Sequence, residues 1–183
     1  MNRNFALFSA CFLALAACQA NVPVKLGTDG KPLPQLTVLD PADLGEIQYR
    51  VLDSVNTLRR ARSAAPLALN AELNAAAATH SRDMAVQNRP WHFGSDGSSP
   101  LERVRRTGYP GIMMGELISE TYETEIETLS AWMEQPDTRS VILDPFARDM
   151  GFAYHQDPSG KIWWTMVTGG PQPVLSPTTV LSQ

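Results

Sequence analysis

Cysteine is almost absent from this chain. The chain has two cysteines, Cys11 and Cys18, and both lie in its N-terminal segment. The rest of the sequence therefore has neither a disulfide bond nor a thiolate that could bind a metal. A chain of 183 residues is long enough to bury a core as one domain, so the body must be stabilised by that core.

Other features that would assign a function directly are absent as well. The sequence has no Gly-x-Ser-x-Gly motif of a serine hydrolase and no glycine-rich loop of a nucleotide-binding protein. Its formal net charge is -4, which excludes the basic surface typical of nucleic-acid-binding proteins. The arginines that do cluster are expected on solvated helix faces. They are Arg59, Arg60, Arg62, Arg103, Arg105 and Arg106.

The apolar run near the N-terminus is too short to span a membrane. It extends from Phe5 to Ala17, whereas a bilayer needs about 20 apolar residues. A short apolar run after a basic start is typical of a secretory signal, here assigned to residues 1–17. The segment Leu15-Ala16-Ala17-Cys18 resembles a bacterial lipobox, so we expect Cys18 to carry a lipid that anchors the protein to a membrane.

Ordinary secretion, with cleavage after Ala17 or Ala20, is the alternative to lipidation. Residues 18–40 are polar and rich in proline, which predicts a flexible tether behind the anchor. The folded body is predicted over residues 41–171, and residues 172–183 are expected to form a loose tail. We expect an extracytoplasmic protein of the cell envelope, in the outer membrane or periplasm if the source is Gram-negative.

Hydrophobic periodicity predicts several helices and a β-hairpin in the body. Apolar residues recur at helical spacing from Asp40 to about Ser63 and again from Asn70. A short helix is predicted between the capping residue Ser99 and Gly108, and a further helix ends before Pro136. Strand patterns are found over residues 115–118, 150–155 and 162–168. Helices combined with a hairpin, without βαβ alternation, predict an α+β fold.

Six short segments follow one another between Val51 and Gly169. They are Val55-Asn56-Thr57-Leu58-Arg59, Pro66-Leu67-Ala68-Leu69-Asn70, Asp83-Met84-Ala85, His92 with Asp96-Gly97, Arg103 with Gly108-Tyr109, and Gly151-Phe152-Ala153-Tyr154. In this order they resemble bacterial members of the CAP superfamily, the SCP-like extracellular domains. The resemblance implies an α-β-α sandwich with a central antiparallel sheet. It also implies a central cleft, which in many members carries two histidines and two acidic residues and sometimes holds zinc or magnesium.

The chain departs from the family pattern at two positions of that cleft. The family's Gly-Glu-Asn-Ile is Gly115-Glu116-Leu117-Ile118 here, which keeps the carboxylate and loses the amide. The family's Ser-Pro-Gly-His-Arg is Gln135-Pro136-Asp137-Thr138-Arg139, so Thr138 stands where the second histidine would be. The resemblance thus predicts a ligand cleft formed by His92, Glu116, Asp137 and Thr138.

The predicted cleft has too few residues that could bind a metal ion tightly. A catalytic zinc usually has three protein ligands, and the resemblance supplies only His92 and Glu116. Asp137 or Glu134 would have to provide the third. A tight zinc site is therefore not expected, although a weak site for a divalent cation such as magnesium or calcium is compatible with the remaining oxygen atoms. Without a metal, His92 and Glu116 could act as a general acid–base pair or form a structural hydrogen bond.

Three functions are compatible with these residues. We rank first a binding module for a lipid, peptidoglycan or protein ligand, because the second histidine is missing and a tether is predicted. A structural scaffold ranks second. A hydrolase, with or without an assisting metal, ranks third, with His92 and Glu116 as its catalytic residues. His80 lies on the apolar stripe of its helix and is expected to be a core or cleft-edge histidine with a backbone partner rather than a ligand.

Overall fold

The structure is a computed structural model that describes residue 28 and residues 37–172. The predicted signal peptide, the lipidation site Cys18 and most of the predicted tether lie outside the described residues, as does most of the predicted tail. Within the described part of the chain, no helix is long and apolar enough to cross a membrane.

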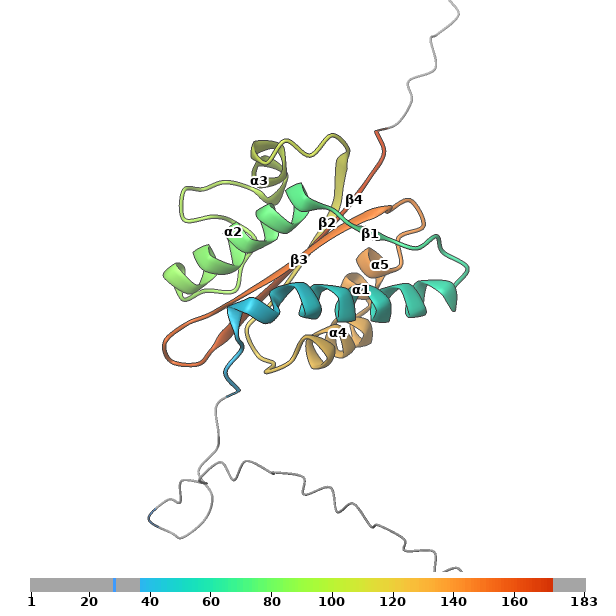
Figure 1. Cartoon of the computed structure of the whole chain (residues 1–183). Helices are drawn as coiled ribbons and strands as arrows, with labels where there is room; N and C mark the ends of the chain where they lie inside the picture. Colours follow the sequence, from blue (N-terminus) through green and yellow to red (C-terminus); the bar gives the residue numbers. More distant parts are fainter. Residues whose placement is uncertain (1–27, 29–36, 173–183) are drawn as a thin grey trace, which may run out of the picture. The chain divides into compact units, whose positions relative to one another are not determined.

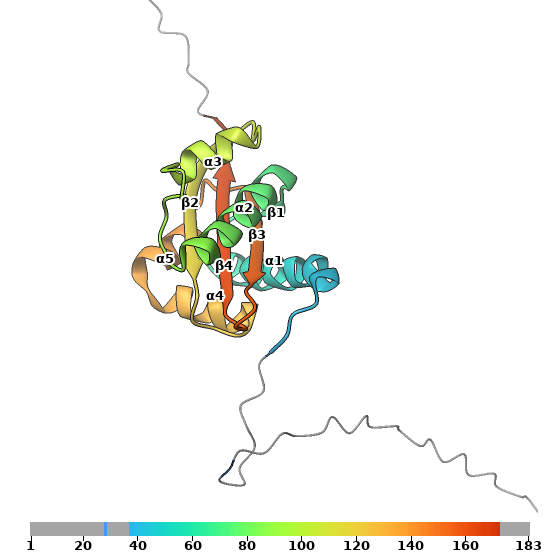
Figure 2. The ribbon, with the colours of Figure 1, turned by 90° about the vertical axis from the view of Figure 1, so that its left-hand side faces the viewer.

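The body is a three-layer sandwich of helices around one sheet (Figures 1 and 2). The helices are a short 3-10 helix η1 (Pro41–Asp43), α1 (Leu44–Arg60), α2 (Ala71–Gln87), α3 (Pro100–Arg106), α4 (Glu125–Glu134) and α5 (Pro136–Ile142). The strands are β1 (Ala68–Leu69), β2 (Ile112–Ser119), β3 (Asp149–Gln156) and β4 (Ile162–Gly170). Helices α2 and α3 cover one face of the sheet, and α1, α4 and α5 cover the other. The predicted α+β sandwich is therefore confirmed.

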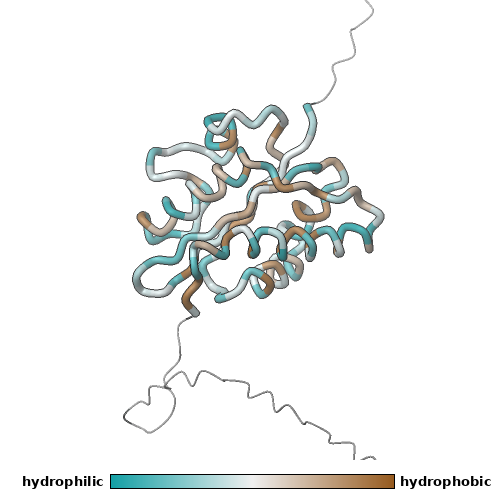
Figure 3. Tube along the Cα trace, in the orientation of Figure 1, coloured by the Kyte–Doolittle hydropathy of each residue, from teal (hydrophilic) through white to brown (hydrophobic). Residues whose placement is uncertain are grey.

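The sheet has the strand order β1-β3-β4-β2. The pairings among the three long strands are antiparallel, as predicted, and the two-residue β1 adds a parallel pairing to β3. Strand β4 lies between β3 and β2, and all of its residues are buried. The buried hydrophobic residues accordingly come from both the strands and the helices, and Figure 3 shows hydrophobic residues on both kinds of element. Strand β2 is paired with this buried strand, which therefore fixes the position of β2.

Local capping signals explain where most helices begin. The side chains of Asn70, Ser99 and Thr124 each accept a hydrogen bond from a backbone N–H in the first turn of α2, α3 and α4. At α3 the capping box is complete, because Glu102 also bonds back to the backbone N–H of Ser99. The caps thus fix the start of the two helices that enclose the loop carrying His92.

The packed body begins upstream of the predicted boundary at residue 41. The side-chain amide of Gln156 donates to the carbonyl of Thr37, and its oxygen accepts from the backbone N–H of Leu39. The hydroxyl of Thr37 also donates to Glu123 at 2.7 Å. Residues 37–40 are therefore attached to the body rather than belonging to a free tether.

The prediction that Arg59 lies on a solvated face was wrong. Its side chain is fully buried and donates to the carbonyl oxygens of Ala65, Ile142, Asp144 and Ala147. These carbonyls come from the segment that follows α1, from the last residue of α5 and from the segment that follows α5. Arg59 therefore ties the end of α1 to a distant loop, which a local charge pattern cannot reveal.

Candidate functional site

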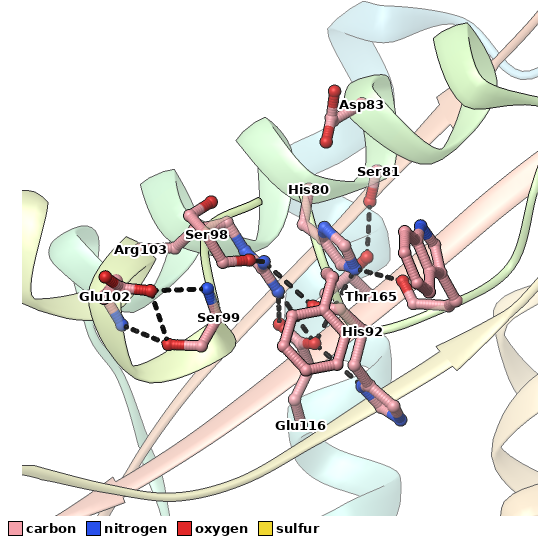
Figure 4. Close-up of polar contacts among 12 residues, drawn as sticks. His80, Ser81, Asp83, His92, Ser98, Ser99, Glu102, Arg103, Glu116 and Thr165 are labelled. Atoms are coloured by element: carbon pink, nitrogen blue, oxygen red, sulfur yellow. Dashed lines mark hydrogen bonds and ion pairs between the residues drawn. The ribbon is translucent and has the colours of Figure 1, made fainter. Parts of the chain in front are cut away.

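The candidate site lies on the face of the sheet that α2 and α3 cover. Glu116 is on β2, opposite Val167 of β4, and Val167 packs in the cluster of residues beneath α2. His92 lies in the loop that connects α2 to α3. Figure 4 shows the side chains of His80, His92 and Arg103 converging on Glu116.

The carboxylate of Glu116 is buried and fully engaged. Its side chain is only 3% exposed. Nη2 of Arg103 donates to both carboxylate oxygens, at 2.9 and 2.7 Å, and Nδ1 of His92 donates to Oε1 at 2.9 Å. Burying a carboxylate is costly unless it is paired and hydrogen-bonded. Arg103 meets that requirement by neutralising the charge.

Arg103 also holds the loop that carries His92. Its Nη1 donates to the backbone carbonyls of His92 and Ser98, at 2.9 and 3.1 Å. Arg103 is 5% exposed, so the prediction of a solvated face is wrong here too. The guanidinium joins the loop, helix α3 and strand β2 in one network.

His80 forms the inner wall of this network. The residue is fully buried, and its Nε2 lies 2.9 Å from the carbonyl oxygen of Trp91. A carbonyl can only accept, so Nε2 carries the proton, and Nδ1 has no hydrogen-bond partner among the described residues. Burial lowers the pKa of His80, although Glu116 at 3.7 Å favours the charged form. The prediction of a core histidine with a backbone partner is confirmed.

His92 is the member of the network that reaches solvent. Its side chain is 49% exposed, whereas those of Glu116 and His80 are almost completely buried. Because Nδ1 is directed to Glu116, the other edge of the ring is the part that a ligand could approach. The site therefore presents one imidazole, held in a fixed orientation, at the protein surface.

The structure does not bring Asp137 and Thr138 into this network. The hydroxyl of Thr138 donates to the carbonyl oxygens of Trp132 and Gln135 at the start of α5. Asp137 is exposed. Among residues 37–172, neither side chain makes a hydrogen bond or ion pair with His92 or Glu116. Of the four predicted cleft residues, the structure thus joins only His92 and Glu116.

The residues present do not fit a metal centre. No group of three or more His, Cys, Asp or Glu side chains in the described part of the chain is placed to hold a metal ion. Both oxygens of Glu116 already accept hydrogen bonds from Arg103, and the positive charge of this guanidinium disfavours a cation beside them. Glu134, the other proposed third ligand, is exposed on α4.

Sequence reasoning missed Arg103 as part of the site. The family-like motif that links Arg103 to Gly108 and Tyr109 was the available signal. The run of arginines around it favoured a solvated interpretation instead. The place of Arg103 in this motif was thus a better guide to its role than the charge of the residues around it.

A hollow that is lined in part by Arg103 adjoins the network. This α2–α3 hollow has a volume of about 460 Å³. Its charged and hydroxyl-bearing lining includes Asp83, Ser95, Asp96, Ser98, Arg103 and Arg106. Arg106 pairs with Asp96, and the hydrogen bonds from Ser98 and Arg106 hold the pKa of Asp96 well below its usual range. The hollow therefore offers both charges and hydroxyl groups to a small polar ligand.

Comparison with known proteins gives the family of this chain. The model of the CAP family, described as the cysteine-rich secretory protein family, matches residues 52–168. The uncharacterized protein YkwD of Bacillus subtilis is 27% identical over 133 residues, which is 73% of this chain and 51% of that protein. The chain thus spans about half the length of the curated relative that it matches.

Solved structures show the same fold. An outer surface protein of Borrelia burgdorferi has a TM-score of 0.64 at 13% identity, over 69% of this chain and 94% of that one. An extracellular protein with an SCP domain from Bacillus anthracis has a TM-score of 0.64 at 20% identity, over 73% of this chain and 44% of that one. At these identities the likeness concerns the fold alone.

Proposed function

Because the chain belongs to the CAP, or cysteine-rich secretory protein, family, we propose that it is an extracytoplasmic binding module rather than an enzyme. The observation that carries this proposal is the state of Glu116, which is buried and neutralised by Arg103. A general base must have an acceptor atom within reach of the substrate proton. Both oxygens of Glu116 accept hydrogen bonds within the network, and the side chain is only 3% exposed, so we assign it the role of orienting His92 and the loop.

The surroundings of His92 also argue against nucleophilic catalysis. An activated serine must lie within hydrogen-bond reach of its base. The hydroxyl of Ser95 instead donates to Asp83 at 2.6 Å, and that of Ser99 donates to Glu102 at 2.9 Å. Ser95 and Ser99 thus support the turn and the helix cap, and the side chain of Ser98 is hydrogen-bonded to Asp96, so none of the three forms a catalytic pair with His92.

Of the ligand classes considered, a peptidoglycan fragment suits the α2–α3 hollow best. The hollow has carboxylates, hydroxyls and arginines beside the apolar surface of residues such as Ala76, so its lining can pair the polar groups of a ligand as well as cover apolar ones. Peptidoglycan fragments carry hydroxyl, amide and charged groups, which such a lining can pair. A lipid anchor at Cys18 and a tether would hold this hollow close to the cell wall, in agreement with the surface and extracellular character of the relatives named above.

The proposal is tested with a soluble chain that starts at Asn21. We expect it to bind soluble peptidoglycan fragments in isothermal titration calorimetry, and we expect Asp83→Asn and Arg106→Ala to weaken binding by about tenfold each. His155→Ala, near the hairpin end of β3 and outside the lining of the hollow, serves as the control. The same samples are assayed for release of cleaved products from sacculi.

Two results would contradict the proposal. Binding that is unchanged in both variants would exclude the hollow. Product release that is lost in His92→Ala and Glu116→Gln would instead establish the hydrolase alternative.

A further inference from the structure

A second surface lies on the opposite face of the sheet, where α1 and α4 pack together. Between them is a groove of about 430 Å³, the α1–α4 groove. Its floor is apolar and includes Leu58, Ile126, Leu129 and Met133. Ile126 is 42% exposed although it is large and apolar. This groove shares no residue with the network around Glu116.

The groove continues across α4 into a second hollow. The two share Ile126 and Ser130, and the second is lined further by Tyr122, Glu127 and Glu134. Tyr122 is 37% exposed, so it extends the apolar strip towards the N-terminal end of α4. The result is one apolar strip along a helix of 10 residues, a length of about 15 Å, or roughly three helical turns.

Carboxylates flank this strip on both sides. Asp53 lines the groove from α1, and Glu127 and Glu134 line the second hollow from α4. All three are exposed, and none forms an ion pair with another described residue. Arg50 on α1 is already paired with Glu125 and Glu46, and these carboxylates offset its positive charge beside the groove.

Two other arginines lie at one end of the groove only. Arg60 donates to the hydroxyl of Thr57, and Arg139 donates to the carbonyl of Met133. The strip is therefore flanked by carboxylates, and its two arginines both lie near the end formed by the C-termini of α1 and α4. A helix has a partial negative charge at its C-terminus, so a helical ligand would have that end towards Arg60 and Arg139.

From this arrangement we infer that the α1–α4 groove is a docking site for a basic amphipathic helix of a partner protein. Its apolar face would lie on Ile126 and Met133, in the manner of helix-in-groove recognition. Its lysines or arginines would reach Asp53 on one side and Glu127 and Glu134 on the other. Charge complementarity of this kind fixes the partner class and accelerates association.

The test uses a fluorescein-labelled leucine–lysine helical peptide of about 14 residues, roughly four turns. Binding to the soluble chain from Asn21 is followed by fluorescence anisotropy at several salt concentrations. A matched peptide with glutamate in place of every lysine reports whether charge matters. A fluorescent fatty acid is tested in parallel as the competing kind of occupant.

Two variants in the groove have matched controls on α2, on the other face of the sheet. We expect Ile126→Ser to raise the Kd by about tenfold and Asp53→Lys to raise it by about fivefold. Val86→Ser removes another exposed apolar side chain, and Glu72→Lys makes the same change in net charge as Asp53→Lys. Both controls should leave the Kd within about twofold. Circular dichroism confirms that all four variants are folded.

The inference is overturned by any of three results. The controls could weaken binding as much as the groove variants do, which would show that only overall charge matters. The glutamate peptide could bind as tightly as the lysine peptide. The fatty acid could bind in the groove while the peptide does not, which would assign the site to an acyl chain.

Discussion

Arg59 and Arg103 begin two similar runs of arginines, yet they have different surroundings. Each is the member of its run that enters the interior. Arg59 donates only to backbone carbonyls, and burial lowers its pKa. Arg103 donates to two carbonyls and to the carboxylate of Glu116.

The comparison shows what Glu116 contributes. Around Arg59, carbonyl oxygens alone are sufficient to hold a buried guanidinium and connect two distant segments. Around Arg103 the same connecting role is present, and a carboxylate from β2 is added. That carboxylate also fixes His92, the exposed member of the network. In the candidate site, a buried arginine that connects distant segments therefore also serves, through Glu116, to hold one imidazole at the surface.

The largest effect is expected for Arg103→Met. Removing one partner of a buried ion pair leaves the other charge uncompensated and costs about 3–5 kcal/mol. We expect the free energy of unfolding, measured by urea denaturation, to fall by that amount. Adding Glu116→Gln should recover part of the loss, because no buried charge then remains. A loss below about 1 kcal/mol would contradict a buried, neutralising pair.

Arg59→Met should cost somewhat less, about 2–4 kcal/mol, because it leaves unpaired carbonyls but no unpaired charge. The distinguishing measurement is urea denaturation of each variant combined with Glu116→Gln. This second substitution should restore stability to Arg103→Met, because it removes the unpaired buried charge, whereas Arg59→Met should show no such recovery. Equal recovery in both variants would remove the distinction between the two arginines.

A third effect concerns His80 and pH. Burial lowers the pKa of His80 from its ordinary value of 6.5, so the unfolded chain binds a proton at a higher pH than the folded chain does. Stability is therefore full above about pH 6.5 and falls as the pH drops towards the folded-state pKa, by up to about 1.4 kcal/mol per pH unit. His80→Gln, whose amide can still donate to Trp91, should flatten this part of the curve. An unchanged curve would mean that His80 is not the group responsible.

The smallest effect is expected for His92→Ala. The ring is half exposed, so loss of its hydrogen bond to Glu116 should lower the free energy of unfolding by only about 0.5–1 kcal/mol. Thermal unfolding at neutral pH measures this difference. A loss as large as that of Arg103→Met would mean that His92, rather than Arg103, holds the network together.

The parts of the fold that depend on local sequence could be predicted. Periodicity and caps located α1 to α4, and the strand patterns over residues 150–155 and 162–168 located the hairpin. Strand β1 was missed because two residues cannot show an alternating pattern. Helix α5 was missed because its segment was interpreted only as a motif with a lost histidine.

The candidate site was predictable only in part. The contact between His92 and Glu116 followed from the order of family-like motifs. The burial of Arg59 and Arg103 did not, because their acceptors come from segments far away in the chain, as with the carbonyl of Ala147 for Arg59. The orientation of Thr138 depends on the free carbonyls at the end of α4, which the family comparison does not contain.

The most direct measurement is thermal unfolding of the soluble chain with increasing zinc, magnesium or calcium, beside His92→Ala. A ligand that binds only the folded state raises the midpoint with concentration. Because Arg103 already occupies both oxygens of Glu116, we expect the midpoint to stay unchanged in wild type and variant alike. A concentration-dependent rise in the wild type that His92→Ala abolishes would show that Glu116 and His92 form a metal site after all.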